Sequence, residues 1–269
     1  MIFNQKRPFP RHRALALSMA ASLVATIGAR PFTLGMSYHI SVVTSMPAMP
    51  GMNPSDMVIT GHGVSVGSRS RVDIDTVRSG SLPLSSGDYI LMLDSGRVVA
   101  VSPLSKTYLD GFSLAAGSMP PDIMAQASVS NVSVHVEKLG AGDQVEGRST
   151  DRYRVTAQYT MSIMGQSMTI ANESDILSVT LPTAVSTPFS GGLPKSMATG
   201  PFAELYAQMI EAHKQIAGTG VKVTTTTSIS GPMTMSLSQS MQITDIKPVE
   251  VDDKLFQIPD GYTARPPTS

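Results

Sequence analysis

Apolar and polar residues alternate along much of the chain, beginning with a run in which Val58, Thr60, His62, Val64 and Val66 share one face. Alternation of this kind is typical of strands that bury one face. Similar runs follow at residues 69–77, 89–93, 98–101, 132–136, 153–163, 168–179, 221–229 and 233–246. Turns rich in Gly, Ser, Pro and Asp separate the runs, so the pattern predicts about ten strands in an antiparallel sheet or open barrel.

A different period marks residues 201–217, where apolar residues recur at steps of three and four and form one stripe of a helix. Thr199 can cap its start, Pro201 suits the first turn, and Gly218 follows its end. A shorter helix is expected at 120–127, and Gly/Pro/Ser-rich mobile loops at 47–54 and 186–199. We therefore predict a mainly β, α+β fold, an open antiparallel half-barrel with one or two helices covering its concave face.

The composition narrows the classes of function. The 269-residue chain has 20 Lys and Arg against 20 Asp and Glu, and so lacks the basic surplus of a nucleic-acid-binding domain. Because the chain has no Cys, disulfides, thiolate metal sites and a cysteine nucleophile are excluded. We expect no nucleic-acid partner and no cofactor.

The N-terminus has the pattern of an export signal. Four basic residues, at positions 6, 7, 11 and 13, precede an apolar run over 14–29. That run is shorter than the roughly 20 apolar residues of a membrane-spanning helix, which indicates a cleavable signal peptide over 1–29 and a periplasmic or secreted protein. Cleavage after Gly35 and an uncleaved N-terminal anchor are the alternatives. After the signal peptide we expect a strand and a Met/Pro/Gly-rich loop over 30–56, one β domain over 36–262, and a tail over 263–269.

Candidate catalytic groups are weak. The segment from Gly63 to Gly67 matches G-x-S-x-G with Ser65 at its centre, but a serine-hydrolase elbow must lead from a strand into a helix. A strand pattern follows Gly67, so a strand end and a hairpin are the better interpretation. The five histidines show no metal-ligand spacing, and the pair Asp73 and Asp75 stands beside Arg71, which indicates a surface ion pair. We expect no enzymatic activity.

Methionine is unusually frequent, with 18 residues. Met46, Met49 and Met52 repeat at steps of three in the loop expected at 47–54. Thioethers are soft ligands, so this triplet is a candidate Cu(I) site. The competing interpretation is that Met fills an irregular apolar space and adapts to variable ligands.

Several short motifs resemble those of exported bacterial proteins of the LolA/LolB-like class, and within it a DUF4412-like family. Residues 67–75 resemble its strand with paired basic residues, and 87–97 the hairpin that follows. Residues 102–108 resemble the P-x-x-K-x-Y step, and 256–262 the closing F-x-I-P-x-G-Y. The resemblance spans about Tyr38 to Tyr262 and implies an unclosed barrel whose hollow face holds lipid or lipoprotein acyl chains, with no catalytic residue to carry over.

We therefore expect a monomeric cell-envelope protein that binds an apolar small molecule, a lipid or a lipoprotein, with peripheral contact to a membrane. The alternatives are an envelope copper protein that uses the Met triplet, and a module for protein interaction. The pocket is expected to be lined by the helix and by facing strands, through Phe202, Leu205, Met209, Tyr153, Val155, Met161 and Met235.

Overall fold

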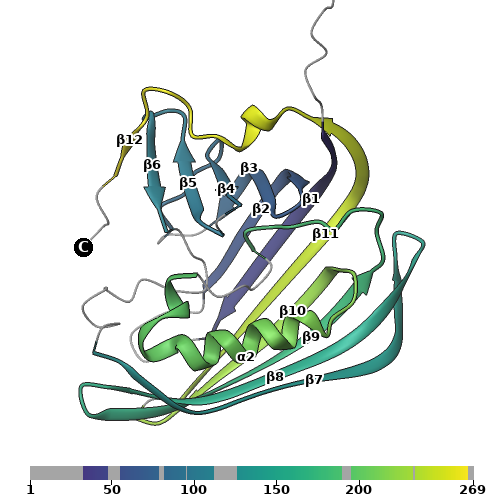
Figure 1. Ribbon diagram of the computed structural model, residues 1–269. Helices are drawn as coiled ribbons and strands as arrows, with labels where there is room; N and C mark the ends of the chain where they lie inside the picture. Colours follow the sequence, from purple (N-terminus) through teal and green to yellow (C-terminus); the bar gives the residue numbers. More distant parts are fainter. Residues whose placement is uncertain are drawn as a thin grey trace, which may run out of the picture. The chain divides into compact units, whose positions relative to one another are not determined.

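A computed structural model (Figure 1) describes residues 33–47, 55–78, 82–94, 96–111, 126–189, 195–232 and 234–265. All of them belong to the second of two compact units, 1–31 and 32–269. The predicted signal peptide, nearly all of the short helix expected at 120–127, and most of the loop at 47–54 lie outside the described residues. The predicted domain boundaries stay predictions.

Twelve strands of the described residues form one sheet in the order β12-β6-β5-β4-β3-β2-β1-β11-β10-β9-β8-β7. The strands are β1 Thr33–Met46, β2 Ser55–Val66, β3 Arg69–Arg78, β4 Tyr89–Met92, β5 Val98–Ser102, β6 Thr107–Asp110, β7 Ser128–Val145, β8 Arg148–Ile163, β9 Gln166–Val179, β10 Thr219–Ser230, β11 Met235–Val251 and β12 Thr263–Ala264. Neighbouring strands are antiparallel except β12 and β6, which are parallel. The two edge strands, β12 and β7, each pair with a described strand on one side only. The sheet is therefore open, which confirms the predicted unclosed half-barrel with a covering helix.

Hairpin turns connect the longest strands. Met164 (φ 50°) and Gly165 (φ 80°) both have positive φ between β8 and β9. Two successive positive φ values are the geometry of the turn that best continues the twist of paired strands. The predicted turn at Gly165 is thus confirmed, and it pairs β8 with β9 without a register shift from Ile163 and Gln166 to Asp151 and Ser178.

The centre of the concave face is filled by the chain itself. After β9 the chain crosses this face, and Val185 and Phe189 are buried in one cluster with residues of β1, β2, β3 and β11. Tyr38 donates a hydrogen bond to Ser186 O over 3.2 Å, and Thr187 is only 2% exposed. The expected mobile loop at 186–199 is therefore wrong for residues 186–189, because they are packed into the core. We call residues 181–189 the plug.

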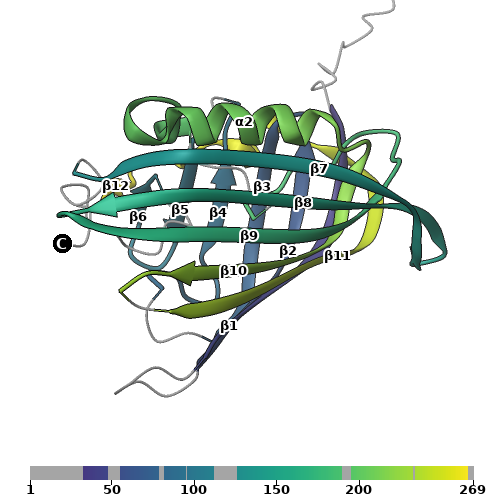
Figure 2. The same ribbon diagram turned by 90° about the horizontal axis from the view of Figure 1, so that it is seen from below.

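The helix expected at 201–217 is present as α2, Ala203–Lys214, after two short 3₁₀ turns, η1 Lys195–Ala198 and η2 Gly200–Phe202. Pro201 lies in the first turn of η2, as predicted. Thr199 precedes η2 with extended backbone, but its side chain makes no capping hydrogen bond. Figures 1 and 2 show α2 running beside the edge strand β7, on the long-stranded side of the sheet.

The C-terminal segment packs on the opposite, outer face. Phe256, at the end of η3 Asp253–Phe256, is buried against Val66 and Val251. Ile258 and Tyr262 cover Tyr89 and Leu91, whose side chains alternate with the inward-facing Ile90. The F-x-I-P-x-G-Y motif therefore closes the outer face, and residues 263–264 of the predicted tail form β12.

Candidate functional site

An apolar layer separates α2 from the sheet. Five of its residues are buried, Ala127, Met161, Ile170, Phe202 and Leu205. Nine more are only partly buried, Val129, Val132, Val134, Tyr159, Ile163, Met168, Met197, Met209 and Ile229. The central cluster has the opposite balance, with 17 buried residues and eight partly buried ones. The layer under α2, which we call the α2 layer, is thus the less completely sealed of the two.

The structure divides the predicted pocket residues into groups. Phe202, Leu205, Met209 and Met161 meet in the α2 layer. Tyr153 and Val155 lie in an adjoining cluster with Ile176, and Val134 contacts both clusters. Met235, near the start of β11, is half-buried and belongs to none of the apolar clusters of the described residues.

A shallow depression opens beside the α2 layer. It has a volume of about 270 Å³ and is lined by Val134, Ala207, Gln208, Glu211, Ala212 and Gln215. Ligand pockets usually enclose about 300–1,000 Å³. The depression is therefore too small for a long apolar ligand unless α2 moves.

Polar attachment of α2 to the sheet is weak. Gln208 Nε2 donates to Val132 O over 3.4 Å, and the Ala217 backbone N–H donates to the Tyr153 hydroxyl over 3.3 Å. Both bonds are long for N–H···O contacts. Apolar packing therefore supplies most of the contact that holds α2 against the sheet.

Uncharged polar side chains cross the same inner face between the α2 layer and the central cluster. On β10, Thr225 and Thr227 alternate inward between Val223 and Ile229, which belong to the flanking apolar clusters. Ser174 Oγ lies 2.9 Å from Thr225 Oγ1, and Thr227 donates to Asn172 Oδ1 over 2.6 Å. Gln239 on β11 and Thr44 on β1 continue the row by register, and Thr44 Oγ1 is buried without a partner. We call Thr44, Gln239, Thr225, Ser174, Thr227 and Asn172 the polar band.

The polar band was not expected from the sequence, because the run from Thr224 to Thr227 indicated only a strand. The available signal was alternation, which puts Thr225 and Thr227 on the face of Val223 and Ile229. Beside the band, burial raises the pKa of Tyr159, while its hydrogen bond with Asn172 partly offsets the increase. The Tyr159 hydroxyl is therefore protonated and able to donate at neutral pH.

The other candidate sites have clear outcomes. Ser65 lies inside β2, directly opposite Ser70 of β3, and is fully buried, so G-x-S-x-G forms a strand end and hairpin as expected. Met46 ends β1, but Met49 and Met52 lie outside the described residues, and the copper site stays a prediction. The ion pair predicted beside Arg71 is confirmed, with Arg71 Nη2 2.6 Å from Asp73 Oδ1.

Comparisons with known proteins give distant likenesses. No family model and no curated protein matches the chain. A LolA superfamily protein from Nitrosomonas europaea is similar at 10% identity and a TM-score of 0.35, over 83% of this chain and 90% of that one. A DUF1329 family protein from Desulfovibrio piger is similar at 10% identity and a TM-score of 0.25, over 83% and 89%.

These likenesses are too remote to carry an inference about function, and the DUF4412-like resemblance stays a prediction. Within the described residues, none of the helices is long and apolar enough to cross a membrane.

Proposed function

We propose that this protein is a non-enzymatic, exported binding protein that takes up an apolar chain, such as a lipid or lipoprotein acyl chain, between α2 and the sheet. The observation that carries the proposal is the α2 layer, where one 12-residue helix lies over seven partly exposed apolar side chains of the strands. The basic and apolar N-terminal pattern supports export. The burial of Ser65 supports a role without serine chemistry.

The polar band favours an amphiphile over a plain hydrocarbon. An acyl chain in the α2 layer would bring its head toward hydroxyl and amide groups that donate and accept hydrogen bonds. None of the six side chains of the band carries a charge. A neutral head, such as an ester, amide or hydroxyl group, suits the band better than a phosphate or an ammonium group, because buried charges need partners.

The energetics set a minimum chain length. Lifting Phe202, Leu205 and Met209 from the sheet costs roughly 1.5–3 kcal/mol for each side chain that becomes fully exposed. Each methylene that becomes buried in the α2 layer stabilises the complex by about 0.8 kcal/mol. Burial of a chain of about ten methylenes therefore offsets the free-energy cost of moving α2, whereas burial of a chain of about four does not.

A reversible clamp on α2 tests the proposal. Because the chain has no Cys, the double variant Gln208→Cys/Val132→Cys can form one disulfide between α2 and β7, at the site of the present hydrogen bond. We expect oxidation to abolish binding of a fluorescent long-chain monoacylglycerol to the full-length protein, and reduction to restore it. Disulfide formation is verified by mass spectrometry, and a short bismaleimide linker replaces it if the bond does not form.

The matched control clamps two strands that are already paired. Ser41→Cys/Thr60→Cys joins β1 to β2 at directly opposite positions without touching α2, and binding should be unchanged in both redox states. Undiminished binding by the oxidised α2 clamp, or the absence of binding by the reduced form and by the wild type, would overturn the proposal.

A further inference from the structure

Two histidines stand side by side on the outer face of the sheet, opposite the face that carries the α2 layer. His39 on β1 is directly opposite His62 on β2, and both side chains are exposed. Side chains of directly opposite residues share a face, with Cβ atoms about 4.5–5.5 Å apart. Two imidazole rings at this separation can turn toward a common point in solvent.

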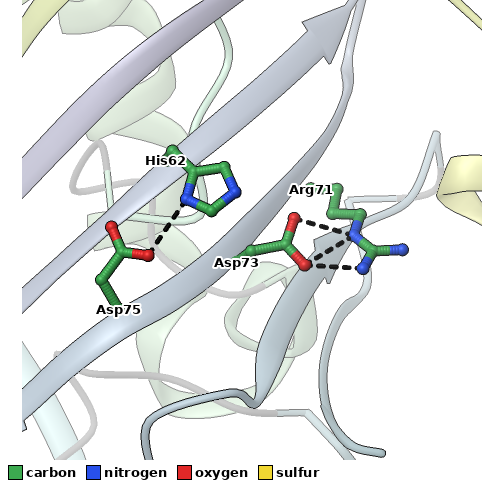
Figure 3. A network of polar contacts seen from close by, with 4 residues as sticks. All are labelled: His62, Arg71, Asp73 and Asp75. Atoms are coloured by element: carbon green, nitrogen blue, oxygen red, sulfur yellow. Dashed lines mark hydrogen bonds and ion pairs between the residues drawn. The ribbon is translucent and has the colours of Figure 1, made fainter.

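A carboxylate fixes the orientation of His62. Its Nδ1 lies 3.1 Å from Asp75 Oδ1, and Figure 3 shows the ring and the carboxylate turned toward each other. A carboxylate only accepts hydrogen bonds, so in the neutral imidazole Nδ1 donates to Asp75 and Nε2 is the nitrogen with the lone pair. This is the arrangement of histidines that bind metals, in which a second partner holds the nitrogen away from the metal and makes the ligand more basic.

A second carboxylate lies near His39. Thr244 on β11 is directly opposite His39, and the next residue, Asp245, binds Lys247, whose Nζ is 2.6 Å from its Oδ1. Asp75, His62, His39 and Asp245 therefore form a row across four neighbouring strands, β3, β2, β1 and β11. Lys247 neutralises the charge of Asp245, so Asp75 is the carboxylate whose charge favours a bound cation at the two rings.

The remaining nearby carboxylate is engaged elsewhere. Asp73 is directly opposite His62, but Arg71 binds it with Nε 3.0 Å from Oδ2 and Nη2 2.6 Å from Oδ1 (Figure 3). The same guanidinium lies 3.9 Å above the Tyr89 ring. Arg71 thus holds Asp73 away from His62, and His62 turns instead to Asp75.

We propose that His39 and His62 chelate one divalent transition-metal ion of the Ni²⁺, Cu²⁺ and Zn²⁺ class, which imidazole nitrogens prefer. The described residues contain no group of three or more His, Cys, Asp or Glu arranged around one metal position. The site therefore supplies two protein ligands, with water in the other positions. An open site of this kind exchanges its metal readily, and its nitrogen ligands differ from the thioethers of the predicted Met triplet, which favour Cu(I).

Titration of the untagged, full-length protein with NiCl₂ at about pH 7.5 tests the site. Isothermal calorimetry should give one Ni²⁺ per chain, and His39→Asn and His62→Asn should each weaken binding by at least about tenfold, because either change removes half of the chelate. Asp75→Asn should weaken it by about tenfold, the effect of removing a partner of a metal-binding histidine. Copper EPR should show coupling to two nitrogens in the wild type.

His135→Asn is the matched control, since His135 is an exposed histidine on β7 with no His directly opposite it. This variant should bind Ni²⁺ within about twofold of the wild type. Circular dichroism verifies that every variant is folded. The proposal is overturned if either His39→Asn or His62→Asn retains wild-type affinity, if His135→Asn loses as much as they do, or if EPR shows one nitrogen ligand.

Discussion

Replacing Gly63 with Ala probes the packing that closes the centre of the concave face. A Cβ atom at this position would lie 2.4 Å from Tyr38 Cζ and 2.7 Å from its hydroxyl oxygen. Tyr38 is 1% exposed and is fixed by its hydrogen bond to Ser186 O in the plug. Because the ring has no free direction, either the ring or strand β2 must move.

The expected cost has two parts. Overpacking a tight core costs about 1–3 kcal/mol, and loss of the Tyr38–Ser186 hydrogen bond adds about 1 kcal/mol. We expect Gly63→Ala to lower the free energy of unfolding by about 2–4 kcal/mol, the sum of those parts. Backbone propensity alone has the opposite sign, since Ala is favoured over Gly inside a strand by roughly 0.5–1 kcal/mol.

Urea unfolding, followed by circular dichroism, measures the change in the free energy of unfolding. A double-mutant cycle then tests whether this change arises from the contact between position 63 and Tyr38. Tyr38→Leu removes the clashing ring atoms, so Gly63→Ala/Tyr38→Leu should be less destabilised than the sum of the two single variants by about 1–2 kcal/mol. If Gly63→Ala is as stable as the wild type, or if the two changes are additive, the ring does not pack against Gly63 and the reasoning fails.

Three further changes test other parts of the fold. Leu205→Ala should lower the free energy of unfolding in urea by about 2–4 kcal/mol. Ile210 lies on the same helix but is 40% exposed, so Ile210→Ala should change that free energy by no more than about 0.5 kcal/mol. Equal losses in the two variants would contradict the orientation of α2. Burial raises the pKa of Tyr38 from 10.0. The stability that the protonated hydroxyl of Tyr38 contributes is therefore fully present below the pKa of the unfolded chain, and it is lost as pH rises through the higher pKa of the folded protein. Tyr38→Phe should therefore flatten the alkaline loss of thermal stability above about pH 10, and a parallel decline in both proteins would refute this. Phe256→Ala should cost about 3–5 kcal/mol in a thermal or urea assay, and a loss below about 1 kcal/mol would mean that the C-terminal segment does not seal the outer face.

Local patterns in the sequence predicted the type of most elements. Alternation identified β8, β9 and β10, and the three- and four-residue steps identified α2, because each signal depends on neighbouring residues. The β2 run was misleading about its buried side. Val58, Thr60 and Val64 look like the core face, but the more deeply buried inner face carries Ile59, Gly61 and Gly63. Gly63 leaves space for the Tyr38 ring from β1, and Gly61 leaves space for the Asp73 carbonyl oxygen from β3. Alternation of apolar residues cannot show either contact.

Local sequence patterns did not predict the contacts between residues that are far apart in the chain. The plug has only three large apolar residues, Leu181, Val185 and Phe189, at steps of four among Ser, Thr and Pro, and the composition from residue 186 onward indicated a loop. The pairing of His39 with His62 depends on the register of β1 and β2. For the proposed pocket, the sequence predicted Leu205 and Met209 from α2 but gave no indication of the polar band, which depends on the inward direction of each strand.

The separation of the two large clusters has a consequence for how a ligand could enter. The central cluster unites β1, β2, β3, β11 and the plug, and none of its buried residues belongs to the α2 layer. Lifting α2 therefore leaves the central packing intact, so ligand exchange need not unfold the sheet. Local opening follows local packing, and hydrogen exchange should show α2 amides exchanging well before those of β1 and β11. A bound long-chain ligand should slow α2 selectively. Exchange of α2 and β1 at one common rate would show a single cooperative unit, and α2 could then move only as the whole fold opens.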